Sequence, residues 1–447
     1  RARGESRAPD VDVFEFIHDA LTCELPTRSP ALAASVRHFA RKFQQVSAPT
    51  MAKGVEDTAF YRYNRLASLN DVGGDPMEFG FPPAKFHRAS AHRAKHWPHT
   101  MLATSTHDNK RSEDVRARID ALSELAAGWR LRLRRWHRMN LARKAMVEDA
   151  PAPTKNDEYL LYQVLLGSFP PGDPDAAALD AYRERIVAYM QKAMREAKAR
   201  TSWARVNEEY EAATTAFINA LLDTHAANPF LEDLRAAAAA IGWLGFLNSV
   251  AMVAVKYTSP GVPDCYQGNE LLDLSLVDPD NRRPVDYDAR RKMLDALCAL
   301  PEAPDEAQLR EIFTASVDGR AKLYVMSRLL RLRQAHEALF VEGSYAPLRT
   351  SGTHARHVVA YARRRGKECA VTVVPRLVGA LGVKTGELPC GEMWGDTRVE
   401  IPFLAADAQV RDVLTGRSLK LVDGGIALAD LLRAAPVSVL CQRDSFA

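Results

Sequence analysis

Hydrophobic residues near the start of the chain change from helical spacing to a short run without that spacing. Within residues 31–46 they recur every three or four positions, which predicts a helix with one apolar face. Residues 48–55, A-P-T-M-A-K-G-V, then predict a short extended segment. The helix is therefore expected to lead into a strand. Its apolar positions are Leu32, Val36, Phe39, Phe43 and Val46.

A second strand is predicted at residues 99–106, after a loop rich in glycine and proline at residues 72–83. Ser112 then has the features of a helix N-cap. Glu113 and Asp114 would lie in the first helical turn, where the helix dipole favours acidic side chains. The apolar residues of this helix share one face, and they are Val115, Ile119 and Leu122.

Residues 120–230 have an almost unbroken helical pattern, interrupted by proline at residues 151–153 and 170–174. Its apolar positions are Trp129, Leu133, Trp136, Tyr182, Ile186, Tyr189, Val206, Tyr210 and Phe217. The run W-R-L-R-L-R-R-W-H-R at residues 129–138 has two interpretations. It could bind phosphate groups, or it could be an amphipathic helix with a buried stripe and a solvated basic face.

The remaining pattern predicts a helix at residues 241–255, a strand and loop at 257–270 and a helix at 323–332. From about residue 343 the apolar runs become short and rich in β-branched residues, as in a small antiparallel domain. Within it, V-R-D-V-L-T-G-R-S-L-K-L predicts a hairpin that turns at Thr415 and Gly416.

Three helix, strand and loop units thus end in polar loops that carry carboxylates. This order predicts an α/β fold that is part of a (β/α)8 barrel, where functional residues collect at the carboxyl ends of the strands. We expect a barrel portion at residues 1–118 and an inserted helical domain at residues 119–235. The end of the barrel would occupy residues 236–342 and a β domain residues 343–447.

Charge and composition limit the classes of ligand that this chain is expected to bind. With 60 basic and 56 acidic residues the net charge is only +4, so nothing favours nucleic acid or an acidic membrane surface, and a neutral ligand is expected. Six widely separated cysteines suggest free thiols in a reducing cytoplasm rather than a zinc site or disulfides. We expect no metal or cofactor, no signal peptide and no apolar run long enough to span a membrane.

The first polar loop is M-A-K-G-V-E-D-T-A-F-Y-R-Y-N-R-L at residues 51–66. It combines groups that bind hydroxyls with rings on which a sugar can stack. These groups are Lys53, Glu56, Asp57, Phe60, Tyr61 and Tyr63. The alternative is structural: Phe60 and Tyr63 would be core residues, and the charges would pair with Arg62 and Arg65.

The second loop is T-S-T-H-D-N-K-R-S-E-D-V-R-A-R at residues 104–118. Asp108 directly follows the predicted strand, so its carboxylate would lie at the mouth of the barrel beside His107. Alternatively, the charged residues from Lys110 to Asp114 could form a solvated helix entrance.

The third loop, residues 259–287, begins with a tight turn at Pro260, Gly261 and Pro263. A dense polar segment follows, and a surface turn at Asp-Pro-Asp-Asn is the structural alternative. Its polar residues are Asp264, Tyr266, Gln267, Glu270, Asp278, Asp280, Asn281, Arg282 and Arg283.

Together the three loops resemble those of the maltooligosyltrehalose synthases, a branch of the alpha-amylase superfamily. The resemblance extends from about residue 40 to residue 290 in the expected order. Its specific strings are K-G-V-E-D-T-A-F-Y-R-Y-N-R-L, N-D-V-G-G-D-P, S-T-H-D-N-K-R-S-E-D-V-R-A-R, P-G-V-P-D-C-Y-Q-G-N-E and S-L-V-D-P-D-N-R-R-P-V-D.

The resemblance implies a retaining reaction on an α-glucan, in which a nucleophilic carboxylate and a carboxylic acid lie about 5 to 5.5 Å apart. The reducing-end α-1,4 link of a maltooligosaccharide would become an α,α-1,1 link. Asp108 matches the third carboxylate of the superfamily, which stabilises the transition state, and His107 its hydroxyl-binding neighbour. Further sugar-binding positions would be Lys53, Glu56, Asp57, Tyr61, Lys110, Arg111, Tyr266, Glu270, Asp280 and Arg282.

Asn109 and Asn269 depart from the pattern of the family without removing a charge. A larger departure is that neither an R-V-D-H-like nor an E-K-I-like string, which carry the nucleophile and the acid, occurs in the chain. We therefore expect the C-terminal part of the enzyme, inactive alone, whose partner is the missing N-terminal part. The alternatives are a related α-glucan hydrolase and a catalytically dead glucan-binding piece.

Overall fold

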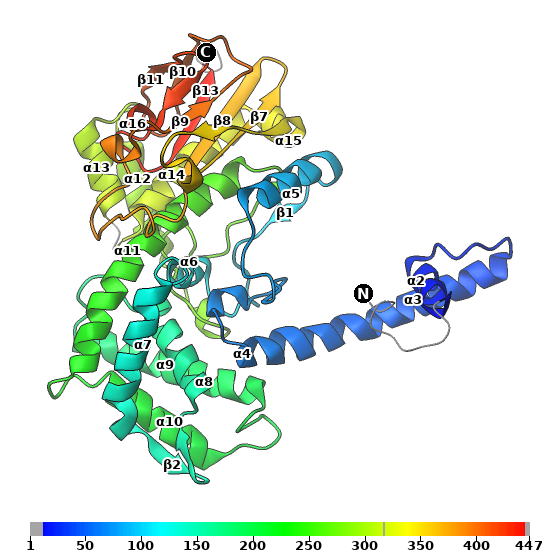
Figure 1. The fold of residues 1–447 in the computed structure, drawn as a ribbon, viewed down its shortest axis with the longest axis vertical. Helices are drawn as coiled ribbons and strands as arrows, with labels where there is room; N and C mark the ends of the chain where they lie inside the picture. The colour runs from blue at the N-terminus through cyan, green and yellow to red at the C-terminus, as the bar shows by residue number, and fades with distance from the viewer. Residues whose placement is uncertain (1–11, 316–317, 443–447) are drawn as a thin grey trace.

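The computed structural model describes residues 12–315 and 318–442. Figure 1 shows a long helical arm that projects from a body made of a helical part and a β-rich part. The arm contains α2 (Asp12–Thr22) and α3 (Pro30–Met51), continued by a π-helical segment (Ala52–Ala59) and α4 (Phe60–Arg62). Ser29 caps α3 by accepting a hydrogen bond from the Leu32 amide, and Pro30 fits the first helical position.

The predicted strand at residues 48–55 is wrong, because this segment continues the helix of the arm. A parallel strand needs neighbours that bond its amides and carbonyls, and no strand of the described residues lies beside this segment. A helix bonds these groups internally. Many apolar side chains of the arm remain exposed to solvent, among them Val13, Phe16, Ile17, Leu32, Phe39, Phe43 and Val46.

Two short parallel strands mark the part of the chain where a barrel was expected. β1 (Met101–Leu102) pairs with β4 (Val262–Pro263), with Met101 opposite Val262. Gly261 has φ +119°, and a Cβ there would lie 2.8 Å from the Thr100 carbonyl oxygen, so glycine permits this close approach. The second and third polar loops leave the same edge of this pair. Within the described residues the parallel sheet ends at these two strands and does not close into a barrel.

Residues 119–235 are mainly helical, but the long helix α11 (Pro229–Thr258) continues across the boundary expected between residues 235 and 236. Trp136 and Phe230 pack edge to face at the core of this helical region, with ring centroids 5.1 Å apart. Val206, which was expected on a helix, lies exposed in the loop before α10, because Asn207 caps that helix. The other elements up to this helix are η2 (Ala67–Leu69), α5 (Pro83–His96), α6 (Glu113–Ala121), α7 (Ala126–Asn140), η3 (Leu141–Arg143), β2 (Ala145–Val147), β3 (Ala150–Ala152), α8 (Lys155–Ser168), α9 (Ala176–Ala197) and α10 (Glu208–Leu221).

By length and composition α11 could cross a membrane, which contradicts our expectation that no apolar run is long enough. However, 67% of its most apolar window is buried inside the protein. The helices α6, α8 and α14 pack along it. Burial among other helices accounts for its apolar composition.

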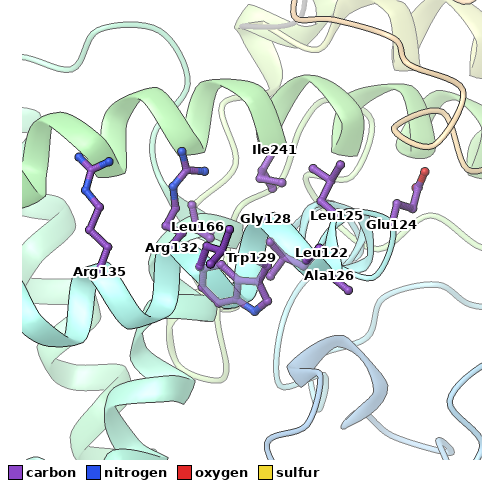
Figure 2. Close-up of a pocket in the computed structure, with 12 residues that line it drawn as sticks. Leu122, Glu124, Leu125, Ala126, Gly128, Trp129, Arg132, Arg135, Leu166 and Ile241 are labelled. Atoms are coloured by element: carbon purple, nitrogen blue, oxygen red, sulfur yellow. The ribbon is translucent and has the colours of Figure 1, made fainter.

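The basic run at residues 129–138 lies on α7, with Trp129 and Trp136 buried. A hollow of about 580 Å³ lies where α7 faces α11, and its lining includes Leu122, Leu125 and Ile241 (Figure 2). Arg132 and Arg135, at one end of the hollow, both form ion pairs with Asp233. These contacts agree with the interpretation as an amphipathic helix.

The C-terminal region contains the expected antiparallel sheet, in the strand order β11-β10-β13-β8-β7-β5. The predicted hairpin is confirmed: β10 (Gln409–Asp412) pairs with β11 (Ser418–Lys420), and Gly416 in the turn has φ +69°. The remaining strands are β5 (Ser344–Pro347), β6 (Thr350–Ser351), β7 (Val358–Arg365), β8 (Glu368–Pro375), β9 (Arg398–Glu400), β12 (Gly425–Ala427) and β13 (Ser438–Gln442). The helices are η4 (Asp280–Arg282), α12 (Tyr287–Cys298), α13 (Glu306–Thr314), α14 (Arg320–Ala335), α15 (Glu337–Glu342), η5 (Ala355–His357), η6 (Gly391–Trp394) and α16 (Leu428–Leu431).

Candidate active site

The loop that carries His107 and Asp108 follows β1 and is exposed. The side chains of His107 and Asp108 are 59% and 69% exposed, and His107 Nε2 lies 3.4 Å from Asp108 Oδ2. Both groups are therefore accessible to a ligand that approaches the loop.

Buried groups beneath this loop fix its backbone. Asn109 donates from Nδ2 to Asp71 Oδ1 at 2.5 Å, and its Oδ1 accepts a hydrogen bond from the Thr106 amide at 2.5 Å. The Lys110 amide also donates to Asp71 Oδ1, at 3.3 Å. Asn109, one of the departures from the pattern of the family, thus has a structural role: it holds the turn that presents Asp108.

The first polar loop contacts this turn through a chain of charged groups. Asp57 lies between two lysines, with Lys53 Nζ 2.6 Å from Oδ2 and Lys110 Nζ 2.9 Å from Oδ1. Burial alone would raise the pKa of Asp57, but the hydrogen bonds from the lysines outweigh it and lower this pKa. The hydrogen bond and charge of Asp57 raise the pKa of Lys53, with smaller contributions from Glu196 and Asp108. Asp57 therefore stays ionised and holds both lysines near the turn.

Asn281 connects the third polar loop to the same turn. Its Nδ2 donates to the His107 carbonyl oxygen at 2.9 Å, and its own carbonyl oxygen accepts a hydrogen bond from the Tyr266 hydroxyl at 3.2 Å. The three loops, far apart in sequence, therefore meet around His107 and Asp108.

Several predicted site residues are occupied by other contacts. Arg185 holds Asp280 through two bonds of 2.8 Å, and Arg290 lies 3.1 Å from Glu270. Arg282 pairs with Asp278 at 2.6 Å, and Glu56 accepts a hydrogen bond from the Gly73 amide at 3.2 Å. These contacts order the loops, and a direct contact with a ligand remains a prediction for these residues.

Tyr61 and Arg111 are fully buried. Arg111 donates to the Tyr189 hydroxyl at 2.7 Å and to the Asn70 carbonyl oxygen at 2.6 Å. Its charge therefore supports the loop from inside the protein and does not face solvent. The alternative of a solvated helix entrance is wrong, because Lys110, Arg111, Glu113 and Asp114 are all buried.

Known proteins are similar to this chain over most of its length. A protein of Mycobacterium tuberculosis described as a maltooligosyl trehalose synthase is 37% identical over 404 residues, which are 90% of this chain and 45% of the relative. The structure of maltooligosyltrehalose synthase from Arthrobacter ramosus matches 97% of this chain and 49% of its own, with 34% identity and a TM-score of 0.72. A hypothetical maltooligosyl trehalose synthase of Sulfolobus tokodaii matches 96% of this chain and 53% of its own, with 31% identity and a TM-score of 0.66.

The chain belongs to the maltooligosyltrehalose synthase family. The resemblance carried by the three loops is thereby confirmed. No protein-family model matches the chain. The chain spans about half the length of the curated relatives it matches.

A buried ionic network lies behind the His107 loop of this chain. Lys322 Nζ, on α14, lies 2.9 Å from Glu113 Oε1 and 2.8 Å from Asp114 Oδ2. Lys256 Nζ, on α11, lies 3.4 Å from Glu113 Oε2 and donates to Thr104 Oγ1 at 2.8 Å. The network thus joins α6, α11 and α14 to the residues that follow β1.

The two neighbouring acids of this network differ in how they ionise. Burial would raise the pKa of Glu113, but Lys322 and Lys256 outweigh it and lower the pKa to about 2. Burial raises the pKa of Asp114, and Lys322 offsets only part of that rise. The sequence pattern treated both acids as helix-dipole partners and missed the network, because Lys256 and Lys322 are distant in sequence. The only available signal was a lysine directly beside each predicted apolar helix, Lys256 after residues 241–255 and Lys322 before residues 323–332.

Proposed function

We propose that this chain supplies part of the active site of an intramolecular transglucosylation. In that reaction the reducing-end α-1,4 link of a maltooligosaccharide becomes an α,α-1,1 link. Family membership supports this activity. The observation that carries the proposal for Asp108 is its exposed carboxylate on a loop held by Asn109 and Asn281.

Asp108 is assigned to stabilise the reacting glucosyl unit as positive charge develops at its anomeric carbon. His107 donates to a hydroxyl of the same unit. Lys53, Asp57 and Lys110 offer donors and an acceptor beside this loop, and Tyr266 contacts Asn281, which holds the same loop. Such a mixture suits a neutral ligand rich in hydroxyls.

The nucleophile and the acid of the family belong to strings that this chain does not contain, and the described residues hold one parallel strand pair. We propose that β1 and β4 belong to a (β/α)8 barrel. Its remaining strands would come from a part of the enzyme that corresponds to the half of the relatives this chain does not match. The isolated chain would then form no trehalose link. The free thiols support a reducing, cytoplasmic location.

The helical arm offers a surface for that missing half. Its apolar side chains, among them Phe16, Phe39 and Phe43, are exposed. Exposed apolar residues that gather on one element mark a surface that another part of a protein covers. We propose that the complementary half packs on α2 and α3 and brings the two further carboxylates to Asp108.

The role of Asp108 can be tested with Asp108→Asn in the reassembled enzyme, that is, this chain combined with its complementary half. The variant keeps the shape of the side chain and removes its charge, so trehalose formation from maltopentaose should fall about a thousandfold, equivalent to about 4 kcal/mol of barrier. Asp288→Asn is the matched control, because Asp288 is an exposed acid on α12 in a surface ion pair with Arg291. Its activity should stay near that of the unaltered enzyme.

Three outcomes would contradict parts of the proposal. Near-normal activity of Asp108→Asn would remove the role of this carboxylate. Free glucose as the main product of the reassembled enzyme would indicate a hydrolase. Turnover of maltopentaose by the purified 447-residue chain would show that it needs no complementary half.

A further inference from the structure

The loop between α9 and α10 is fastened to the first polar loop of the candidate site. Lys198 Nζ donates to Thr58 Oγ1 at 3.1 Å. In the other direction, Arg62 donates to the carbonyl oxygens of Ala197 and Lys198, the latter at 3.2 Å. Residues 198–207 therefore keep a fixed position beside the segment that carries Lys53 and Asp57, and Figure 1 shows the end of α4 close to α8 and α9.

This loop borders a polar hollow of about 760 Å³. The lining contains three basic residues, Lys198, Arg200 and Arg205, and three acidic ones, Glu148, Glu208 and Glu209. The formal charge of the lining is therefore zero. Hydroxyl and amide groups in the lining add donors and acceptors without adding charge. A neutral ligand with many hydroxyls fits this lining, whereas a phosphorylated ligand would also meet the three carboxylates.

Trp203, on the same loop, is 55% exposed although its position is fixed. Its Nε1 donates to Glu196 Oε1 at 3.0 Å, and the guanidinium of Arg195 lies 4.9 Å from its ring centroid. Arg195 is itself held by Glu211 through bonds of 2.9 and 2.7 Å. The indole is thus oriented before any ligand arrives, so stacking on it costs little ordering of the ring.

Glu196 connects Trp203 to the site electrostatically as well. Its charge and that of Asp108 both contribute to the raised pKa of Lys53, after the larger contribution of Asp57. Lys53 therefore lies within electrostatic range of both the residue that anchors Trp203 and the candidate carboxylate.

We propose that Trp203 and the hollow beside it form a second contact for the α-1,4-glucan, which binds glucose units remote from the reacting one. This inference rests on the proposed function for the substrate class. It adds a binding position that determines how strongly the enzyme prefers long chains over short ones. A glucan long enough to extend from Asp108 to Trp203 would contact both residues, whereas a shorter one would contact only one of them.

The test is a titration of the full 447-residue chain with maltoheptaose and with maltose, followed by calorimetry. Trp203→Ala should weaken maltoheptaose binding about tenfold, the equivalent of one aromatic stacking contact. Trp203→Phe should retain most of the affinity, because a ring remains. Trp97→Ala is the matched control. Trp97 is 65% exposed, but it precedes β1, whereas Asp108 follows β1. Loss of the Trp97 ring should leave the affinity for maltoheptaose unchanged.

Equal affinity of Trp203→Ala and the unaltered chain, in samples with matching circular dichroism, would overturn the inference. An unaltered chain that does not bind maltoheptaose would overturn it too. These results are distinguishable from failure of the proposed function, which depends on the activity of Asp108→Asn. If that variant stays active while Trp203→Ala binds weakly, only the role of Asp108 is wrong.

Discussion

Asp108 and Glu113 lie five positions apart, yet their surroundings are opposite. Asp108 is exposed on a loop, where the only ion pair of its side chain within the described residues is with His107 at 3.4 Å. Glu113 is almost fully buried and touches two lysines. Buried charges need partners inside the protein, whereas exposed charges are stabilised by water until a ligand replaces it. The comparison separates charges that stabilise the fold from charges that remain available for chemistry.

Lys322→Met, which tests the buried charges around Glu113, should cause the largest loss of stability. The change would leave Glu113 and Asp114 in the interior without the lysine that pairs with both of them, and breaking a buried ion pair in this way costs about 3–5 kcal/mol. Hydrogen exchange of the α6 amides measures this loss separately from the C-terminal sheet.

Lys85→Met is the matched control for that variant. Lys85 and Glu78 form an ion pair of 2.6 Å, shorter than those of Lys322, but both side chains are largely exposed. An exposed pair contributes less than about 1 kcal/mol. Equal losses in the two lysine variants would mean that burial does not distinguish the two kinds of charge.

Acid should weaken the buried network through Glu113. Its pKa in the folded protein is about 2, below the ordinary 4.5, so its contribution to stability is complete above about pH 4.5 and disappears as the pH falls towards 2. The shift corresponds to about 3 kcal/mol. Unfolding measured between pH 6 and pH 2 should show this loss in the unaltered chain, and Glu113→Gln should flatten the curve.

Asp114→Asn provides the contrast for the pH experiment. Burial raises the pKa of Asp114, so its protonation favours the folded state as the pH falls, which opposes the effect of Glu113. The asparagine variant should therefore retain the acid sensitivity or increase it. A flattened curve in this variant would show that the two acids had been assigned the wrong way round.

Elements with local patterns were predictable from the sequence, whereas elements that depend on distant neighbours were not. The face of Val115, Ile119 and Leu122 and the hairpin at Gly416 needed only local spacing, and both are present. The segment at residues 48–55 was expected to be a strand. A strand is stable only beside other strands, and here a helix forms in its place.

For the site, the sequence indicated three loops but not the side chains that connect them. Asn281 and Asp71 fix the turn at Asp108 through bonds to residues far along the chain, and no local pattern signals such contacts. Lys256 and Lys322 lie directly beside predicted helices and were missed for the same reason. Arg111, expected to bind substrate, is buried against Tyr189, because α9 covers it.

Asn281→Ala should lower stability less than these variants, and only in the exposed loop that carries His107 and Asp108. It removes the donor to the His107 carbonyl oxygen, and the loss of one such bond costs about 1 kcal/mol. Amides of residues 106–109 should exchange faster while those of α6 stay protected. Gln267→Ala, an exposed change in the same loop, is the control and should leave both sets unchanged. Uniformly faster exchange would mean that Asn281 stabilises the whole fold.

Asp108→Asn should have the smallest effect on stability, within about 0.5 kcal/mol, because an exposed side chain away from caps and networks contributes little. The same change should remove most activity from the reassembled enzyme, so stability and activity separate at this residue. Lys322→Met should instead lower the stability strongly, and this loss can be measured in the isolated chain without any substrate. If Asp108→Asn instead destabilised the chain by several kcal/mol, its carboxylate would belong with Glu113 among the charges that hold the fold.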